Sequence, residues 1–172
     1  MIFAVLFFVL LFFILGAVVG SFSNVLIYRM PRGESINFPA SHCQSCKTSL
    51  KPYHNVPIFA WLFLRGKCAF CGEKISFQYP LVELACALLC VLAYFFETRG
   101  LEPFADSFYA AIFKAAMLGI CFILLLALSL IDFRYKAVPD PLLFASVAFS
   151  LLYDFNLPAS FDSDELLRAF DS

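Results

Sequence analysis

Charged side chains are scarce in this sequence of 172 residues. Asp, Glu, Lys and Arg make up 15% of it, and none of them lies between Met1 and Tyr28. The formal net charge of −1 gives no sign of the basic surface that binds nucleic acid, so we expect no nucleic-acid partner. Glycine is also scarce. None of the seven glycines belongs to a nucleotide-binding motif, so the residues that would bind a nucleotide-derived cofactor stay unknown.

Apolar residues dominate the chain instead. They account for 62% of it, against roughly 45–50% in ordinary soluble domains. Residues 1–28 exceed the roughly 20 residues of a membrane span, and they lack the basic start and short apolar core of a signal peptide. The composition therefore predicts an all-α polytopic membrane protein in a lipid bilayer. We expect about four transmembrane helices, one at 1–28 and three within 75–157.

The longest polar section, residues 29–74, contains two Cys-x-x-Cys pairs. Cys43 and Cys46 are separated by 21 residues from Cys68 and Cys71. Each pair can wrap a tight turn around a shared tetrahedral ion, which predicts a small zinc-ribbon-like loop with a structural Zn²⁺. A section this short has too little core to fold alone, so a bound ion would supply the missing stability.

The residue after each cysteine pair bears on this prediction. Gly72 follows the second pair and suits a turn that needs positive φ, whereas Lys47 follows the first pair and makes it the weaker half. The cysteines have other interpretations: two disulfides, four structural thiols, or thiol–disulfide exchange, which would need an accessible thiolate of low pKa.

The distribution of basic residues favours metal over disulfides. Nine Lys and Arg residues collect on the side of the cysteine loop and of the turn after Asp132, and two collect on the opposite side. Basic loops face the cytoplasm, so the loop and Asp132 are expected on the cytoplasmic side of the membrane. Thiols stay reduced in that compartment, which disfavours stable disulfides.

Three acids are placed where they could act chemically. Asp132 ends a long apolar run, and Asp140 follows across a short proline-containing turn. Two carboxylates that share a proton can act as general acid and base, although an acid at the end of a span is often only a solvated boundary residue. Glu83 lies about a turn inside the second span, where an acid needs a polar partner for either a structural or a functional role.

Small residues indicate how the spans pack. Gly16 and Gly20 form a small-x-x-x-small pair that would let another helix approach closely, unless this spacing arose by chance. Cys86, Cys90 and Cys121 lie inside apolar runs and are most simply packing residues.

Taken together, these stretches resemble the bacterial prepilin peptidases, also called type IV leader peptidases, which are A24-type aspartic peptidases. The resemblance covers nearly the whole chain. The matching segments, in the order of the family, are residues 20–31, the two cysteine pairs, 55–58, 61–68, 79–84, 131–132 and 139–140.

The resemblance implies a membrane-embedded aspartic endopeptidase of the bacterial inner membrane. Such enzymes cut the leader from type IV pilin and type II secretion pseudopilin precursors, and many then methylate the new N-terminus with S-adenosylmethionine. Asp132 matches the first of the two catalytic aspartates of the family, with Asp140 and Glu83 as possible active-site support. Cys43, Cys46, Cys68 and Cys71 match the cytoplasmic zinc-type domain.

One departure from the family pattern changes the expectation. The second catalytic aspartate of the family lies in a Gly-x-Gly-Asp motif, which none of the seven glycines forms. Residues 158–172 have the pattern of the start of a further, truncated helix. We therefore expect an N-terminal portion that is inactive alone and needs its missing half from elsewhere, for example a second chain. The alternative is a non-catalytic, zinc-stapled subunit for membrane assembly or regulation.

Overall fold

The computed structural model describes residues 2–99, 101 and 106–155, so the further helix predicted at 158–172 lies outside the described residues. Within these residues the backbone forms helices and turns and no β-strand, as the predicted all-α class requires. The elements, in chain order, are α1 (Ile2–Arg29), η1 (Met30–Arg32), η2 (Pro52–Asn55), α2 (Phe59–Phe63), α3 (Gln78–Glu97), α4 (Asp106–Tyr135) and α5 (Asp140–Phe155).

Three of the helices are long and apolar enough to cross a membrane. These candidate spans are Ile2–Arg32, Gln78–Glu97 and Ser107–Tyr135. Helix α5 has 16 residues and a length of about 24 Å, which is less than the hydrocarbon thickness of about 30 Å. The described chain thus contains three spans of full length and a shorter fourth helix.

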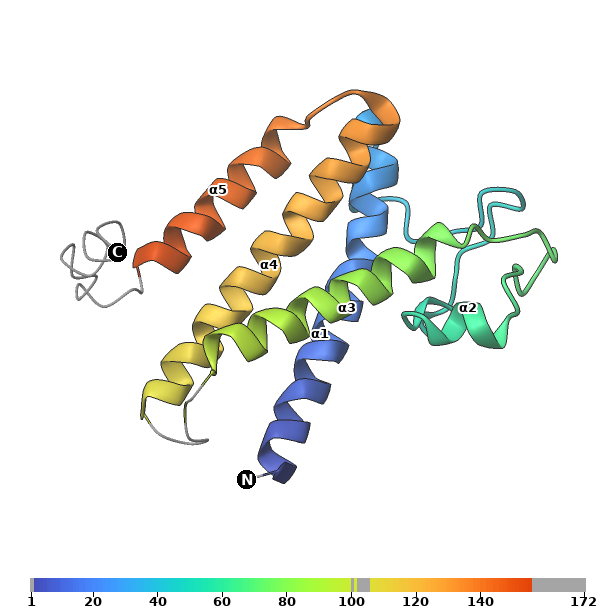
Figure 1. Ribbon diagram of the computed structural model, residues 1–172. Coiled ribbons are helices and arrows are strands. Elements are labelled where there is room, and N and C mark those ends of the chain that lie inside the picture. The colour runs from blue at the N-terminus through green and yellow to red at the C-terminus, as the bar shows by residue number, and fades with distance from the viewer. Residues whose placement is uncertain (1, 100, 102–105, 156–172) are drawn as a thin grey trace.

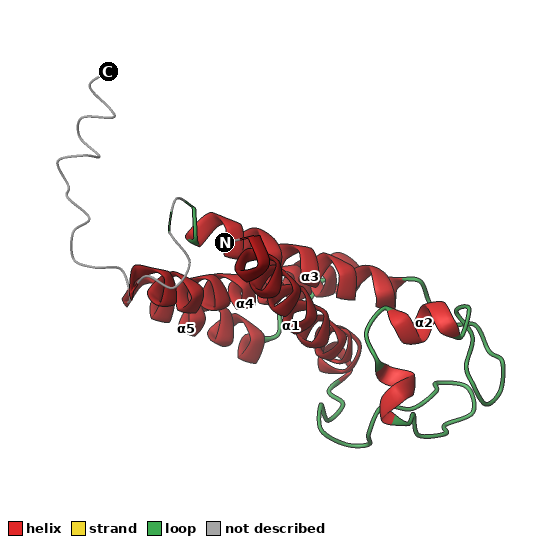
Figure 2. Ribbon diagram, turned by 90° about the horizontal axis from the view of Figure 1, so that it is seen from below, coloured by secondary structure: helices red, strands yellow, loops and turns green. Residues whose placement is uncertain are grey.

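The four long helices form a bundle in which neighbours in sequence pack against each other. Helices α1 and α4 run in one direction, and α3 and α5 run back, with α3 crossing α1 obliquely (Figure 1). The polar section between α1 and α3, which carries α2, lies at one end of the bundle beside the start of α3 (Figure 2). The fold therefore brings this polar section next to a single end of the membrane helices.

Helix α1 packs closely on α3 at its two inner glycines. A Cβ atom at Gly16 would lie 2.7 Å from the carbonyl oxygen of Cys86 and 2.8 Å from the Cα of Ala87. A Cβ atom at Gly20 would lie 2.8 Å from the Cβ of Cys86. The prediction of a close helix contact is confirmed, because any larger side chain at these positions would push the two helices apart.

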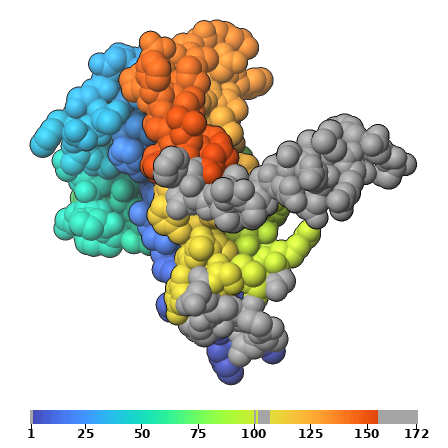
Figure 3. Space-filling model, turned by 90° about the vertical axis from the view of Figure 1, so that its left-hand side faces the viewer, coloured from blue at the N-terminus to red at the C-terminus, as the bar shows by residue number. Residues whose placement is uncertain are grey.

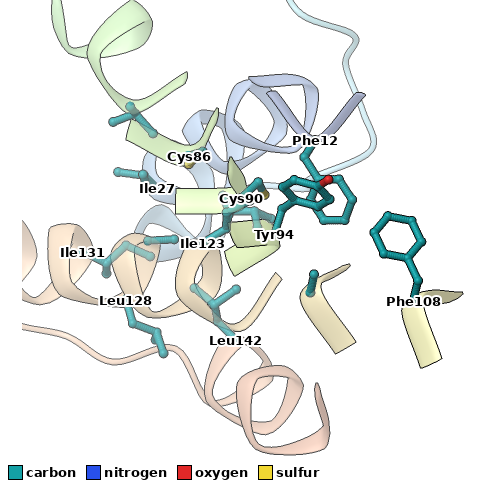
Figure 4. Close-up of a cluster of buried hydrophobic side chains, with 14 residues drawn as sticks. Phe12, Ile27, Cys86, Cys90, Tyr94, Phe108, Ile123, Leu128, Ile131 and Leu142 are labelled. Carbon is teal, nitrogen blue, oxygen red and sulfur yellow. The ribbon is translucent and has the colours of Figure 1, made fainter. Parts of the chain in front are cut away.

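The buried core lies where α1, α3 and α4 meet. Side chains of α3, among them Cys86, Cys90 and Tyr94, project toward side chains of α1 and α4 (Figure 4). The three cysteines inside the spans, Cys86, Cys90 and Cys121, are all buried, as packing residues should be. The other labelled members of this cluster are Phe12, Ile27, Phe108, Ile123, Leu128, Ile131 and Leu142.

Large apolar side chains also cover the outside of the bundle. Phe3 of α1 is 88% exposed and Phe144 of α5 is 71% exposed, a degree of exposure that suits contact with lipid rather than water. In the space-filling view, the polar section (light blue to blue-green) lies to one side of the helices (Figure 3). The lipid-facing surface and the polar section are therefore separate faces of the molecule.

Candidate functional site

The four cysteines of the polar section meet in space. The sulfur atoms of Cys43, Cys46, Cys68 and Cys71 all lie within 4.8 Å of one another, and all four are free thiols. Two pairs that are far apart in sequence therefore form one cluster, which we call the four-cysteine cluster.

Two similar turns position these sulfur atoms. The backbone N–H of Lys47 donates to the carbonyl of Cys43 at 2.9 Å, and the N–H of Gly72 donates to the carbonyl of Cys68 at 3.0 Å. Lys47 has φ +57° and Gly72 has φ +72°, so both turns close in the left-handed region. The first pair thus adopts the same turn as the second in spite of its lysine, for which this conformation costs energy.

This difference between the turns gives a prediction with a built-in comparison. Gly72→Ala is expected to weaken metal retention by roughly fivefold, because a Cβ in the left-handed region costs about 1 kcal/mol. Lys47→Gly removes that cost from the other turn and is expected to strengthen retention. Competition with a chelator measures both variants. Equal effects of the same sign would contradict the assignment of strain.

Hydrogen bonds favour the thiolate form at two of the cysteines. Bonds from the side chain and the backbone of Thr48 lower the pKa of Cys46 to about 6. Bonds from the backbone of Cys71 and Phe70 lower the pKa of Cys68. Thiolates are the form that binds metal, so the local backbone prepares both pairs for a cation.

Cys71 shows the opposite tendency. The backbone of Glu73 bonds to its sulfur, but burial and the neighbouring thiols outweigh that bond and raise the pKa of Cys71 to about 12. Four sulfur atoms this close cannot all carry negative charge unless a cation is between them. The cluster is therefore a set of ligands that a divalent ion would complete.

The spacing of the sulfur atoms fits a tetrahedral ion. Metal–sulfur bonds of about 2.3 Å in a tetrahedron separate the sulfur atoms by about 3.8 Å. The Sγ atoms of Cys43 and Cys71 are 3.8 Å apart. The donor set and its spacing thus fit a structural metal site.

A cavity of about 420 Å³ lies between the four-cysteine cluster and the membrane helices. Glu83 of α3 lines it together with Ser21 and Asn24 of α1, and Cys43 and Cys68 of the polar section line it as well. The cavity therefore joins the metal-type site to the polar end of the bundle.

Glu83 finds its partner in the polar section. Its Oε2 accepts a hydrogen bond from the backbone N–H of Ile58 at 2.7 Å, and the side chain is only 7% exposed. Nearby, the amide of Asn24 donates to the carbonyl of Tyr79 at 3.1 Å, which fastens α1 to the start of α3. The sequence indicated that Glu83 needed a partner but gave no sign that a loop backbone would supply it.

Asp132 and Asp140 lie on either side of the turn between α4 and α5. Both are exposed, and within the described part of the chain neither carboxylate forms an ion pair or a side-chain hydrogen bond. Arg134 donates to the side-chain oxygen of Gln78 at 3.0 Å and so ties the end of α4 to the start of α3. Asp132 is thus at the same end of the bundle as Glu83, although it does not line the cavity.

Arg29 is a structural residue that the sequence reading missed. It is only 7% exposed, and its guanidinium donates to the carbonyls of Ser35 at 2.9 Å and Pro39 at 2.7 Å. The available signal was its position as the first charged residue after an uncharged span of 28 residues. Arg29 therefore fixes the beginning of the polar section to the end of α1.

Comparison with known proteins gives this arrangement a context. Residues 14–96 match the family described as the bacterial peptidase A24 N-terminal domain. A prepilin leader peptidase/N-methyltransferase from Vibrio cholerae serotype O1 (strain ATCC 39315 / El Tor Inaba N16961) is 33% identical over 171 residues, covering 95% of this chain and 63% of the relative. One from Klebsiella pneumoniae is 37% identical over 151 residues, with 81% and 60% covered.

A third relative matches a shorter part more strongly. The prepilin leader peptidase/N-methyltransferase of Myxococcus xanthus (strain DK1622) is 49% identical over 82 residues, which cover 48% of this chain and 24% of the relative. The chain spans less than two thirds of the length of each of these three relatives. No solved structure matches. The chain matches the N-terminal portion of the bacterial prepilin peptidases.

Proposed function

We propose that this chain contributes one half of a membrane-embedded aspartic endopeptidase that removes the leader from type IV prepilins or pseudopilins. The observation that carries the proposal is the match of 95% of the chain to a prepilin leader peptidase/N-methyltransferase. The first span would be residues 1–28, and the metal loop would be residues 29–74. The remaining spans, which carry the first catalytic aspartate, would lie in residues 75–157. S-adenosylmethionine is the methyl donor that the resemblance implies.

Asp132 would be the catalytic carboxylate of this half. Its exposure at the end of α4 leaves it free to meet a second carboxylate and a peptide bond at the membrane surface. In such a pair one carboxylate takes a proton from the attacking water, and the other, protonated, gives a proton to the leaving amine. The second carboxylate would come from a Gly-x-Gly-Asp motif outside these 172 residues, so this chain alone would not cleave.

Zn²⁺ is the ion that we assign to the four-cysteine cluster. Cys43, Cys46, Cys68 and Cys71 would hold it with no open position, because four thiolates complete a tetrahedral site. When bound, the ion supplies folding stability to the loop and no Lewis-acid chemistry. This role agrees with the closed arrangement of the four sulfur atoms.

The orientation that we propose places the four-cysteine cluster and Asp132 on the cytoplasmic side of the bacterial inner membrane. The excess of basic residues at this end of the bundle supports it, since Lys and Arg in short loops favour the cytoplasm. The unprocessed leader of a prepilin would then meet Asp132 before the precursor leaves the cytoplasm.

Reconstitution tests the function directly. The chain is produced with the C-terminal portion of the Vibrio cholerae relative, either fused or as a second polypeptide, in a strain that lacks prepilin peptidase. Cleavage of a prepilin by the combined protein, and none by either half alone, is the expected result. Cleavage by the 172-residue chain alone would contradict the proposed division. A combined protein that inserts and binds zinc but does not cleave would favour a non-catalytic assembly or regulatory subunit.

A further inference from the structure

The buried carboxylate of Glu83 is the starting point. It lies on α3 at the depth of a membrane span, where an acid side chain is costly unless it makes a strong polar contact. Its contact crosses from the membrane bundle to the polar section, because Ile58 lies just before α2. The two residues are 25 positions apart, so this bond joins two separate parts of the fold.

The N–H group that donates to Glu83 belongs to an unusual turn. Ile58 has φ +64° and ψ −55°, and the N–H of Phe59 donates to the carbonyl of Pro57 at 2.6 Å. This combination is the rare γ-turn of positive φ, which is strained, and a β-branched residue makes the strain larger. Strain of this kind persists only where the surroundings hold it, and the 2.7 Å bond to Glu83 is the contact made by the N–H of the strained residue.

The turn controls where α2 lies. Immediately after it, Trp61 of α2 donates from its Nε1 to the carbonyl of Ile75 at 3.1 Å and packs its ring against Phe77 at 5.4 Å. Ala60, Trp61 and Leu64 line the 420 Å³ cavity, and Glu83 lines it as well. The bond between Ile58 and Glu83 therefore joins α2 and α3, two elements that line the same cavity.

We propose that Glu83 is a positioning residue that fastens α2 to the membrane bundle through the strained turn at Ile58, and so fixes the width of the cavity under the four-cysteine cluster. Loss of the acceptor lets the turn relax and α2 move away, which opens the cavity while the membrane helices stay packed. The proposal concerns the shape of the loop and does not depend on peptidase activity.

The single tryptophan of the chain is a built-in reporter for this movement. The purified chain in nanodiscs is compared as wild type, Glu83→Leu and Glu83→Gln. In Glu83→Leu, acrylamide is expected to quench Trp61 more strongly, and the amides of residues 59–64 are expected to exchange roughly tenfold faster, the effect of losing one hydrogen bond. Glu83→Gln keeps an oxygen acceptor and is expected to behave like the wild type.

Two further variants separate positioning from general destabilisation. Leu81→Ala changes an exposed residue of the same helix and is expected to leave Trp61 quenching unchanged. Ile58→Gly removes the steric cost of positive φ, so the effect of Glu83→Leu is expected to be smaller in this background. The proposal is overturned if Glu83→Leu leaves residues 59–64 protected, if Glu83→Gln is as disruptive as Glu83→Leu, or if α1 and α4 lose protection equally with α2.

Discussion

Asp132→Asn is expected to reduce prepilin cleavage by about 10³-fold or more in the protein completed with the C-terminal portion of the Vibrio cholerae relative. Asparagine has nearly the same shape as aspartate, so α4 and its turn should keep their structure. It cannot accept a proton from water, however, and a carboxylate pair that has lost one member cannot share a proton between acid and base. Conversion of radiolabelled prepilin to mature pilin in membranes measures the loss.

Two other acids serve as comparisons for Asp132. Asp140→Asn tests whether the neighbouring carboxylate belongs to the same machinery. Its loss of cleavage is expected to be much smaller than that of Asp132→Asn, because we propose that the second catalytic aspartate comes from outside the chain. Glu34→Gln changes an exposed acid of the polar section and is expected to leave cleavage unchanged. If the Asp132→Asn protein retained most of its activity, that result would contradict the assignment of Asp132 to the catalytic pair.

Removal of the metal is expected to unfold the polar section while the bundle survives. Structural zinc contributes on the order of 10 kcal/mol to small cysteine sites, more than a loop with so little buried core can replace. Cys68→Ser, or treatment with a strong chelator, should therefore abolish the metal and expose residues 41–75 to protease. Far-UV circular dichroism should lose little signal, because α1, α3 and α4 contain most of the described helix.

Metal analysis provides the stoichiometry and the matched control. One zinc per chain is expected for the wild type. Cys121→Ser alters a buried thiol of α4 that is outside the cluster, so its metal content should not change. A metal-free wild-type chain whose polar section resists protease, or a chain with two disulfides, would contradict the assignment of the cluster.

The parts of the site that the sequence predicted are those that local spacing determines. The Cys-x-x-Cys pairs favour tight turns, so the meeting of their four sulfur atoms in one cluster followed from the pattern, and Gly16 and Gly20 similarly indicated a close helix contact. The glycine at position 72 predicted the positive φ of that turn. The lysine at position 47 did not predict one, because there the turn imposes a positive φ that lysine itself disfavours.

The remaining features depend on contacts that no local pattern encodes. The turn at Ile58 is unfavourable in isolation and exists because Glu83 and α2 hold it, so a sequence reading has no reason to place it there. Whether Asp132 is catalytic stays a prediction, because its exposed position suits an active-site acid and a solvated boundary residue equally.

The bonds of Arg29 have a consequence for how the protein responds to its membrane. Helix α1 has 28 residues and a length of about 42 Å, so it exceeds the hydrocarbon layer of about 30 Å and can accommodate the difference by tilting. A tilt of this kind depends on bilayer thickness. Arg29, the last residue of α1, donates hydrogen bonds to the carbonyls of Ser35 and Pro39. A thinner or thicker bilayer would therefore tilt the start of the polar section together with the helix.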